Sequence, residues 1–447
     1  MENSDSKVLG VVLLIRHGDR QGFYQDPTTY TPSNTVLTPL GNQQEYQLGQ
    51  LLRQVYLNSS SPSYINGMNG TLVNDAQFRV RADAGGEGGV IVNSAQSLIQ
   101  GLIPANSNFT TTLANGTTIE APLNGYQYLP IESVEPTNDI SLEGWTSCQT
   151  FDKSTSAFYN STEFQEKAAE YKNFLDLLPQ FLDGRSVNLQ NMVLFWNIYD
   201  FMNVNFIHNS AFAKALPQGY LETARYLADW HEYNVFSDPQ LDGIGNIAGQ
   251  TILPSIIDGF NSILNDTDPV KFVYLAISYK PFLSLFSMTK VTEASPELAA
   301  IVNYAAVLAL EVRQPASGEP VLRFNFMNGT GTDFKRYHIL GSTSDVLVSE
   351  FMSQLQPAEI DSINQWCSVC INTQDRGCGA LSVAVAESRP TISPVSAGFL
   401  GAGLMLAVAL AMFAVLFFLG CLTVGHKRKR STKTSIVSVT LIRMKQI

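Results

Sequence analysis

Charged residues are scarce in this chain of 447 residues. Asp, Glu, Lys and Arg make up only 15% of the sequence and hydrophobic residues 45%, a balance that excludes an intrinsically disordered protein. Acidic residues outnumber basic ones by 39 to 28, and seven of the basic residues follow His426. The rest of the chain is therefore strongly acidic, which excludes a nucleic acid as its partner.

Nucleotide loops are missing, and cysteines are few. Segment 85–89 contains four glycines, but no Gly-Lys-Ser/Thr sequence follows it, which excludes a Walker-type loop.

Of five cysteines, Cys421 lies in a long apolar stretch. The others fit two disulfides in an oxidising compartment, with three connectivities open: Cys148, Cys367, Cys370 and Cys378. A zinc site at Cys367 and Cys370 is the weaker interpretation, because no histidine is close in sequence.

One long apolar run lies near the C-terminus. Residues 396–424 carry no charge, and a helix over 399–422 exceeds the ~30 Å hydrocarbon core of a bilayer. The basic cluster 427–430 follows at once, which predicts a cytosolic tail. The sequence therefore predicts a stalk over 381–394, a transmembrane helix over 395–424 and a basic cytosolic tail over 425–447.

The body before this helix is expected to be lumenal or extracellular. Sequons for N-glycosylation support this placement, at Asn58, Asn69, Asn108, Asn115, Asn160, Asn265 and Asn328. No signal peptide is seen, because residues 1–7 are polar and the next apolar run has only eight residues. We expect that the natural N-terminus is missing from the chain. The alternative is a tail-anchored protein with a cytosolic body and unused sequons.

The candidate site follows the first apolar run. Residues 8–15 are uncharged and mostly branched, which predicts a buried parallel strand. Arg16, His17 and Arg20 come at its C-terminal end, where open α/β sheets bind ligands. Arginines offer planar forks of donors that fit phosphate oxygens, and a neutral imidazole between them can attack phosphorus. Gly18 lets the backbone approach closely. A solvated strand end is the alternative interpretation.

The segment 16–20 resembles the R-H-G-x-R-x-P signature of the histidine acid phosphatases, which include phytases, although Gly22 replaces the proline. Segments 37–44 and 94–98 are similar to two helices of that family. The resemblance covers residues 8–380 and implies a phosphoglycerate mutase-like α/β core sheet flanked by helices, with an inserted helical cap. It also implies that His17 forms a phosphohistidine, and that Arg16, Arg20 and Arg81 bind the phosphoryl group of a small-molecule substrate.

One family feature is missing. The family has a His-Asp pair that binds phosphate and protonates the leaving group, and no such dipeptide occurs here. After the strand predicted over 271–277, Lys280 and Pro281 stand in the two places. Lysine can bind a phosphate oxygen as a point charge, whereas proline cannot donate a proton. The proton donor is left open.

Three carboxylates near the motifs could replace the missing acid. They are Asp19, Asp83 and Glu87. We expect each to be a solvated loop carboxylate instead, because acidic side chains are mostly exposed. His208, His231 and His338 are expected to be structural histidines.

The chain is predicted to form one core interrupted by a cap. Residues 1–103 and 246–380 form the two parts of the core, with a helix over 40–56, and 104–245 form the helical cap. Helices are predicted in the cap over 164–182 and 190–208, and a hairpin in the core over 321–327 and 334–340.

Three functions fit these observations. The first is a membrane-anchored phosphomonoesterase that acts through His17. The second is a weakened or inactive relative that binds phosphorylated or anionic ligands, favoured by Pro281. The third is a mutase or phosphotransferase. No metal or organic cofactor is implied, because the arginines supply the charge that a metal would otherwise provide. Substrate identity and oligomeric state are left open.

Overall fold

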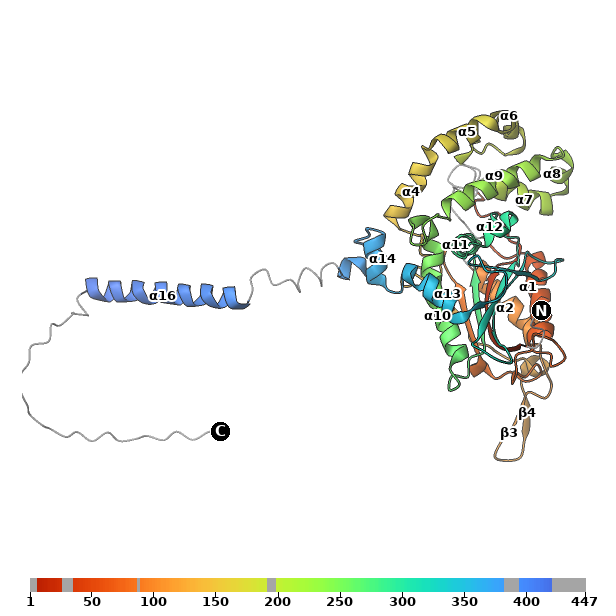
Figure 1. Ribbon diagram of the computed structural model, residues 1–447, viewed down its shortest axis with the longest axis horizontal. Coiled ribbons are helices and arrows are strands. Elements are labelled where there is room, and N and C mark those ends of the chain that lie inside the picture. The colour runs from red at the N-terminus through yellow and green to blue at the C-terminus, as the bar shows by residue number, and fades with distance from the viewer. Residues whose placement is uncertain (1–5, 26–34, 87–88, 191–197, 382–393, 420–447) are drawn as a thin grey trace, which may run out of the picture. The chain divides into compact units, whose positions relative to one another are not determined.

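The computed structural model describes residues 6–25, 35–86, 89–190, 198–381 and 394–419 (Figure 1). The chain divides into two compact units, Met1–Ser382 and Val383–Ile447, and each is described by itself.

One mixed sheet organises the first unit. Its strands lie in the order β10-β8-β7-β1-β6-β2-β5, with β9 beside β8. Strands β1, β6, β2 and β5 are parallel, whereas β7 is antiparallel to β1. The bounds are β1 Lys7–Arg16, β2 Phe78–Asp83, β5 Glu132–Val134, β6 Phe272–Ile277, β7 Val307–Gln314, β8 Val321–Met327, β9 Lys335–Tyr337 and β10 Val346–Leu347. A separate hairpin pairs β3 (Thr110–Thr112) with β4 (Thr118–Glu120).

Helices cover both faces of the sheet, because successive strand side chains point to opposite sides. Val11, Leu13 and Ile15 of β1 pack with α1 and α2, whereas Val12 and Leu14 belong to the core of α10 and α11. The covering helices are α1 Pro39–Tyr56, α2 Val90–Leu102, α10 Ile247–Leu264, α11 Lys280–Met288 and α13 Val348–Leu355. The predicted α/β core sheet flanked by helices is confirmed.

Several local predictions are also confirmed. The strand expected over 8–15 is β1, and the helix expected over 40–56 is α1. The predicted hairpin is the antiparallel pair β8 and β9, in which Phe324 is opposite Tyr337. These elements were predictable because their apolar periodicity is strong.

The helical insertion lies at one end of the sheet (Figure 1). Its helices are α4 Gln149–Tyr159, α5 Thr162–Glu170, α6 Lys172–Leu177, α7 Ile198–His208, α8 Ser210–Ala215 and α9 Tyr220–Val235. The helix predicted over 164–182 is broken into α5, α6 and a 3₁₀ turn. Part of the helix predicted over 190–208 lies outside the described residues.

The predicted cap boundary differs from the structure at β5. This strand belongs to the main sheet, although it lies within the range 104–245 predicted as cap. Three residues are too few to show a strand pattern in sequence. Short helices outside the insertion are α3 Pro122–Gly125, α12 Val291–Ala294 and α14 Ile363–Val369.

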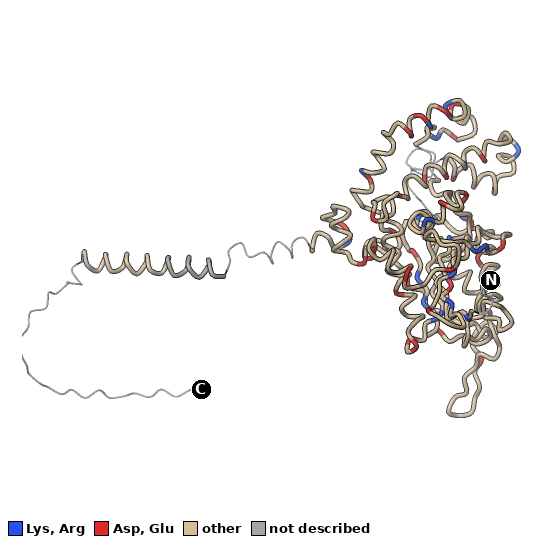
Figure 2. The backbone as a smooth tube through the Cα atoms, viewed as in Figure 1, with Lys and Arg blue, Asp and Glu red and all other residues tan. Residues whose placement is uncertain are grey.

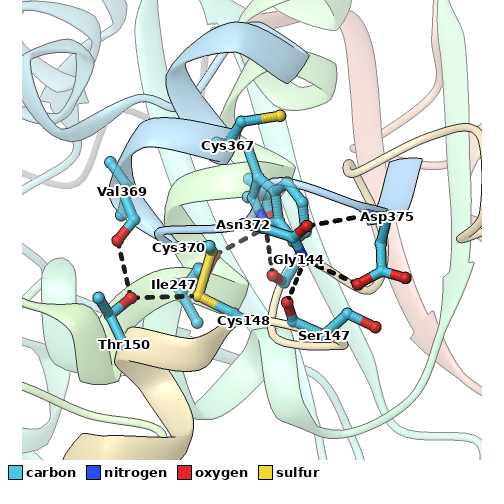
Figure 3. The surroundings of a disulfide bond; sticks show 12 residues. Gly144, Ser147, Cys148, Thr150, Ile247, Cys367, Val369, Cys370, Asn372 and Asp375 are labelled. Atoms are coloured by element: carbon cyan, nitrogen blue, oxygen red, sulfur yellow. Dashed lines mark hydrogen bonds between the residues drawn. A yellow bond between two sulfur atoms is a disulfide. The ribbon is translucent and has the colours of Figure 1, made fainter. Parts of the chain in front are cut away.

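Two disulfides settle the open connectivity of the four cysteines. Cys148 pairs with Cys370, and Cys367 pairs with Cys378, so neither member of the Cys367-x-x-Cys370 motif is a zinc ligand. Around the first bond, Thr150 Oγ1 donates to the Val369 carbonyl oxygen at 2.7 Å (Figure 3). This disulfide joins the start of α4 to the end of α14.

The second unit contains helix α16, Pro394–Phe418. Figure 2 shows acidic and basic residues interspersed along the first unit and neither kind on the described part of α16. Among the residues that the structure describes, no helix combines the length and apolarity needed to cross a membrane. The predicted stalk and tail lie almost wholly outside the described residues.

The carboxyl group of Glu45 on α1 predicts a pH-dependent stability. It is fully buried, and neither oxygen has a hydrogen-bond partner among the described residues. Burial raises its pKa well above the ordinary value of 4.5. The folded state therefore keeps a proton that the unfolded state loses above pH 4.5, and stability falls as the pH rises through this range.

We expect Glu45→Gln to remove this loss. Relative to the native protein, the variant should gain about 1.4 kcal/mol of unfolding free energy per pH unit above the unfolded pKa. Urea denaturation at pH 4 and pH 7 measures the free energy of unfolding of each protein. The difference in this free energy between the variant and the native protein should be larger at pH 7. A difference that is the same at both pH values would show that the pKa of Glu45 is the same in the folded and unfolded states.

Candidate functional site

The segment 16–20 forms a tight loop at the C-terminal end of β1. The His17 amide donates to the Ile277 carbonyl oxygen of β6 at 3.2 Å, which ties the loop to the neighbouring parallel strand. A Cβ atom on Gly18 would lie 2.5 Å from the Gly41 carbonyl oxygen of α1. Only glycine fits at position 18 without a shift of the backbone, because α1 begins directly against the loop.

Helices α1 and α2 also hold the loop through polar side chains. The Gly18 amide donates to Ser94 Oγ at 3.1 Å, and the Asp19 amide donates to Gln44 Oε1 at 2.8 Å. Both acceptors belong to the segments 37–44 and 94–98 whose resemblance to family helices was noted from sequence. These segments therefore fix the loop that carries His17.

The imidazole of His17 is held in one tautomer. The side chain is 1% exposed, and its Nδ1 lies 2.8 Å from the Gly18 carbonyl oxygen. A carbonyl oxygen can only accept, so Nδ1 carries the proton of the neutral ring and Nε2 has the lone pair. This is the form of histidine that acts as a nucleophile.

Arg16 is buried between two aromatic rings. Its guanidinium carbon lies 4.4 Å from the ring centroid of Tyr304 and 5.2 Å from that of Tyr279. Its Nη1 donates to the Val302 carbonyl oxygen. Cation–π contacts stabilise a buried guanidinium and fix its direction.

Arg20 contacts a carboxylate from the cap. The side chain is fully buried, and its Nη1 lies 3.0 Å from Asp200 Oδ1 on α7. The same carboxylate accepts from the Phe23 amide at 2.9 Å. A buried arginine needs an anion nearby, and Asp200 is one.

A second residue of α7 contacts the loop. His208 Nε2 lies 2.7 Å from Asp19 Oδ2, and Thr38 Oγ1 donates to the same carboxylate. Asp200 and His208 are eight residues apart, which is about 12 Å along a helix. Both ends of helix α7 therefore contact the loop, Asp200 through Arg20 and His208 through Asp19. His208, expected to be structural, is part of this contact.

The ring of Tyr304 contacts two of the predicted site residues, Arg16 and His17. Its ring centroid lies 5.6 Å from that of His17. Burial raises the pKa of its hydroxyl, and its charged neighbours are Arg20, Asp200, Arg16 and Asp19. The structure thus brings Arg16, His17 and Arg20 together, as predicted from their adjacency in sequence.

Lys280 and Pro281 begin helix α11. Pro281 is buried in the first turn, while Lys280 Nζ lies 5.1 Å from the ring centroid of Trp145 and lines a cavity of about 460 Å³. The preceding residue, Tyr279, is the one whose ring contacts Arg16, and its hydroxyl donates to Glu232 Oε2 on α9. The phosphate-binding role of Lys280 stays a prediction.

The site role predicted for Arg81 is corrected by its position. Arg81 is level with Leu275 of β6, two residues before the level of Arg16, and β2 continues to Asp83. The alternation of the strand directs its side chain to the α10 face. There it donates to four side chains, and these are Glu132, Asp139, Ser141 and Ser255.

The expectation of solvated carboxylates was wrong for two residues. Asp19 is 0% exposed in its loop, and Asp83 is 1% exposed because it is the last residue of the buried strand β2. Glu87 lies outside the described residues. Sequence reasoning also missed Asp200 and Tyr304, since no local motif distinguishes them.

The fold belongs to a known structural class. The solved phytase from Citrobacter braakii superposes with a TM-score of 0.57 at 13% identity, over 81% of this chain and 99% of that one. At this identity the likeness shows the fold alone. No family model matches the chain.

Sequence relatives point to the same class. Bovine prostatic acid phosphatase is 28% identical over 207 residues, which cover 44% of this chain and 47% of the relative. Lysosomal acid phosphatase of Xenopus laevis is 22% identical over 391 residues, 84% of this chain and 83% of the relative. The chain spans about half the length of the prostatic enzymes it matches. Together these similarities support the predicted resemblance to the histidine acid phosphatases and phytases.

Proposed function

We propose that this chain hydrolyses phosphate monoesters through a phosphohistidine at His17. The observation that carries the proposal is the tautomer of His17, whose Nδ1 is bound to the Gly18 carbonyl oxygen. The lone pair of the neutral ring is thereby on Nε2, and the same loop carries the two buried arginines Arg16 and Arg20. The acid phosphatases among the sequence relatives support the same reaction class.

The reaction has two displacements at phosphorus. Nε2 of His17 forms a bond to phosphorus while the bond to the ester oxygen breaks, and this oxygen leaves as an anion that takes a proton from solvent. Water then attacks the phosphohistidine and releases inorganic phosphate. Arg16 and Arg20 offset the charge that develops on the phosphoryl oxygens. Lys280 is a third cationic contact for these oxygens in this proposal.

We expect His17→Ala to lower phosphate release from p-nitrophenyl phosphate by about 10⁴-fold or more, because the nucleophile is lost. Acid-labile phosphate on the protein, trapped by rapid quenching, should be present in the native chain and absent in this variant. His338→Ala, which changes a histidine outside the site, is the matched control. A His17→Ala protein as active as the native chain would contradict the proposal.

A second candidate function is binding of phosphorylated ligands without turnover. Two observations favour it: Asp200 contacts Arg20, where a phosphoryl group would bind, and Pro281 cannot donate a proton. A folded native protein that releases no phosphate, yet binds inorganic phosphate in a calorimeter, would establish this alternative.

We also propose that residues 395–424 anchor the chain in a membrane, with the body on the lumenal or outer side. The support is the uncharged sequence over 396–424 and the basic cluster after it. Release of the chain from membranes by alkaline carbonate would contradict this anchoring.

A further inference from the structure

A cavity of about 460 Å³ is lined by residues from the cap and by Phe23 and Lys280, which lie near the arginines of the loop in sequence or in space. On one side it is lined by Phe23, whose ring centroid lies 5.7 Å from the guanidinium carbon of Arg20. On another side it is lined by Lys280. The residue before Lys280 in sequence is Tyr279, whose ring contacts Arg16. The cavity is therefore one aromatic ring away from Arg20 and one residue along the chain from the ring that contacts Arg16.

Aromatic rings form much of the cavity wall. The rings of Trp145 and Phe151 each pack against Phe236, at centroid distances of 5.8 and 5.1 Å. Tyr159 stacks on His231 at 5.5 Å, and both line the same cavity. Packed rings of this kind present a fixed apolar surface that an aromatic ligand can stack on.

The charged groups of the wall are mostly acidic. Among the described residues that line it, three are carboxylates, Glu143, Asp152 and Glu232, and one is a basic residue, Lys280. The Glu232 carboxylate contacts His231 Nδ1 at 3.0 Å and accepts from Tyr279, so it is a fixed part of the wall.

We propose that this cavity binds the alcohol part of the substrate and selects an uncharged aromatic alcohol over a polyphosphorylated one. The inference rests on the proposed function, because it takes the scissile phosphoryl group to be at His17. Each additional phosphate would bring about −1.5 to −2 charge into a wall that already holds three carboxylates. An aromatic ring would replace water on the packed rings.

The test compares phosphate release from three alkyl esters, so that the leaving-group chemistry is similar. They are 2-phenylethyl phosphate, glycerol 1-phosphate and inositol hexakisphosphate. We expect kcat/KM for the phenylethyl ester to exceed that for each of the others by at least tenfold. Equal or higher kcat/KM for inositol hexakisphosphate would overturn the proposal.

Two variants locate the selection in this cavity. Trp145→Ala should lower kcat/KM for the phenylethyl ester about tenfold and that for glycerol 1-phosphate less than twofold. Tyr128→Ala, which removes an aromatic ring outside the cavity, is the matched control. Asp152→Lys, at an exposed position of the wall, should raise kcat/KM for inositol hexakisphosphate at least threefold. Equal effects of Trp145→Ala on both monoesters would contradict the role of the ring.

Binding separates failure of this inference from failure of the proposed function. In the His17→Ala protein, calorimetry measures the affinity of each ester without turnover. We expect the phenylethyl ester to bind at least tenfold more tightly than inositol hexakisphosphate. If the native chain releases phosphate from no ester, the proposed function fails, and the order of affinities still decides what the cavity selects. The reverse order overturns the inference.

Discussion

Replacement of both Cys148 and Cys370 by alanine is expected to lower the free energy of unfolding by about 5 kcal/mol. The two cysteines are 222 residues apart in sequence, so their bond removes a large share of the freedom of the unfolded chain. It links the first helix of the cap to the end of α14 (Figure 3). Natural domains are stable by about 5–15 kcal/mol, and the variant should therefore be largely unfolded under mild conditions.

Urea denaturation followed by tryptophan fluorescence measures this loss. The matched control is the double alanine variant of Cys367 and Cys378, which are only 11 residues apart. The same entropy argument gives about 3 kcal/mol for so short a loop. Equal losses in the two variants would show that chain entropy does not dominate, and that local contacts around each bond determine its contribution.

The part of the site that sequence predicted is the part encoded locally. Arg16, His17 and Arg20 lie within five residues of one another, directly after a strand whose apolar pattern is unmistakable. Their grouping required only the geometry of one strand end. The glycine at position 18 was also predictable, because close backbone approach is the common reason for glycine in such a loop.

The residues that sequence could not assign come from distant parts of the chain. Asp200 is 180 residues from Arg20, and Tyr304 is 287 residues from His17. Their placement depends on how the cap and the turn before β7 pack against the loop, which no local pattern encodes. The prediction for Arg81 was wrong for a related reason. Its role depends on where β2 ends and on which face of the sheet its side chain lies.

The missing aspartate leads to the second large expected effect. We expect phosphate release to depend steeply on the leaving group, with kcat/KM for alkyl phosphates lower than for aryl phosphates by about 10²–10⁴ beyond what intrinsic reactivity explains. A nitrophenolate leaves without a proton, whereas an alkoxide needs one. Pro281 stands in the place of the family's donor and is buried within α11.

A series of phenyl phosphates of graded leaving-group pKa, extended to alkyl esters, measures this dependence through the slope of log kcat/KM. Quenched-flow measurement of phosphohistidine hydrolysis is the internal control, because that step is the same for every ester. A shallow slope would mean that another group supplies the proton. Lys280 would then be the first residue to test, since it lines the cavity proposed to bind the alcohol. In that case Lys280→Met should make the slope steep, with the aryl esters little affected, because only the poor leaving groups depend on the donor.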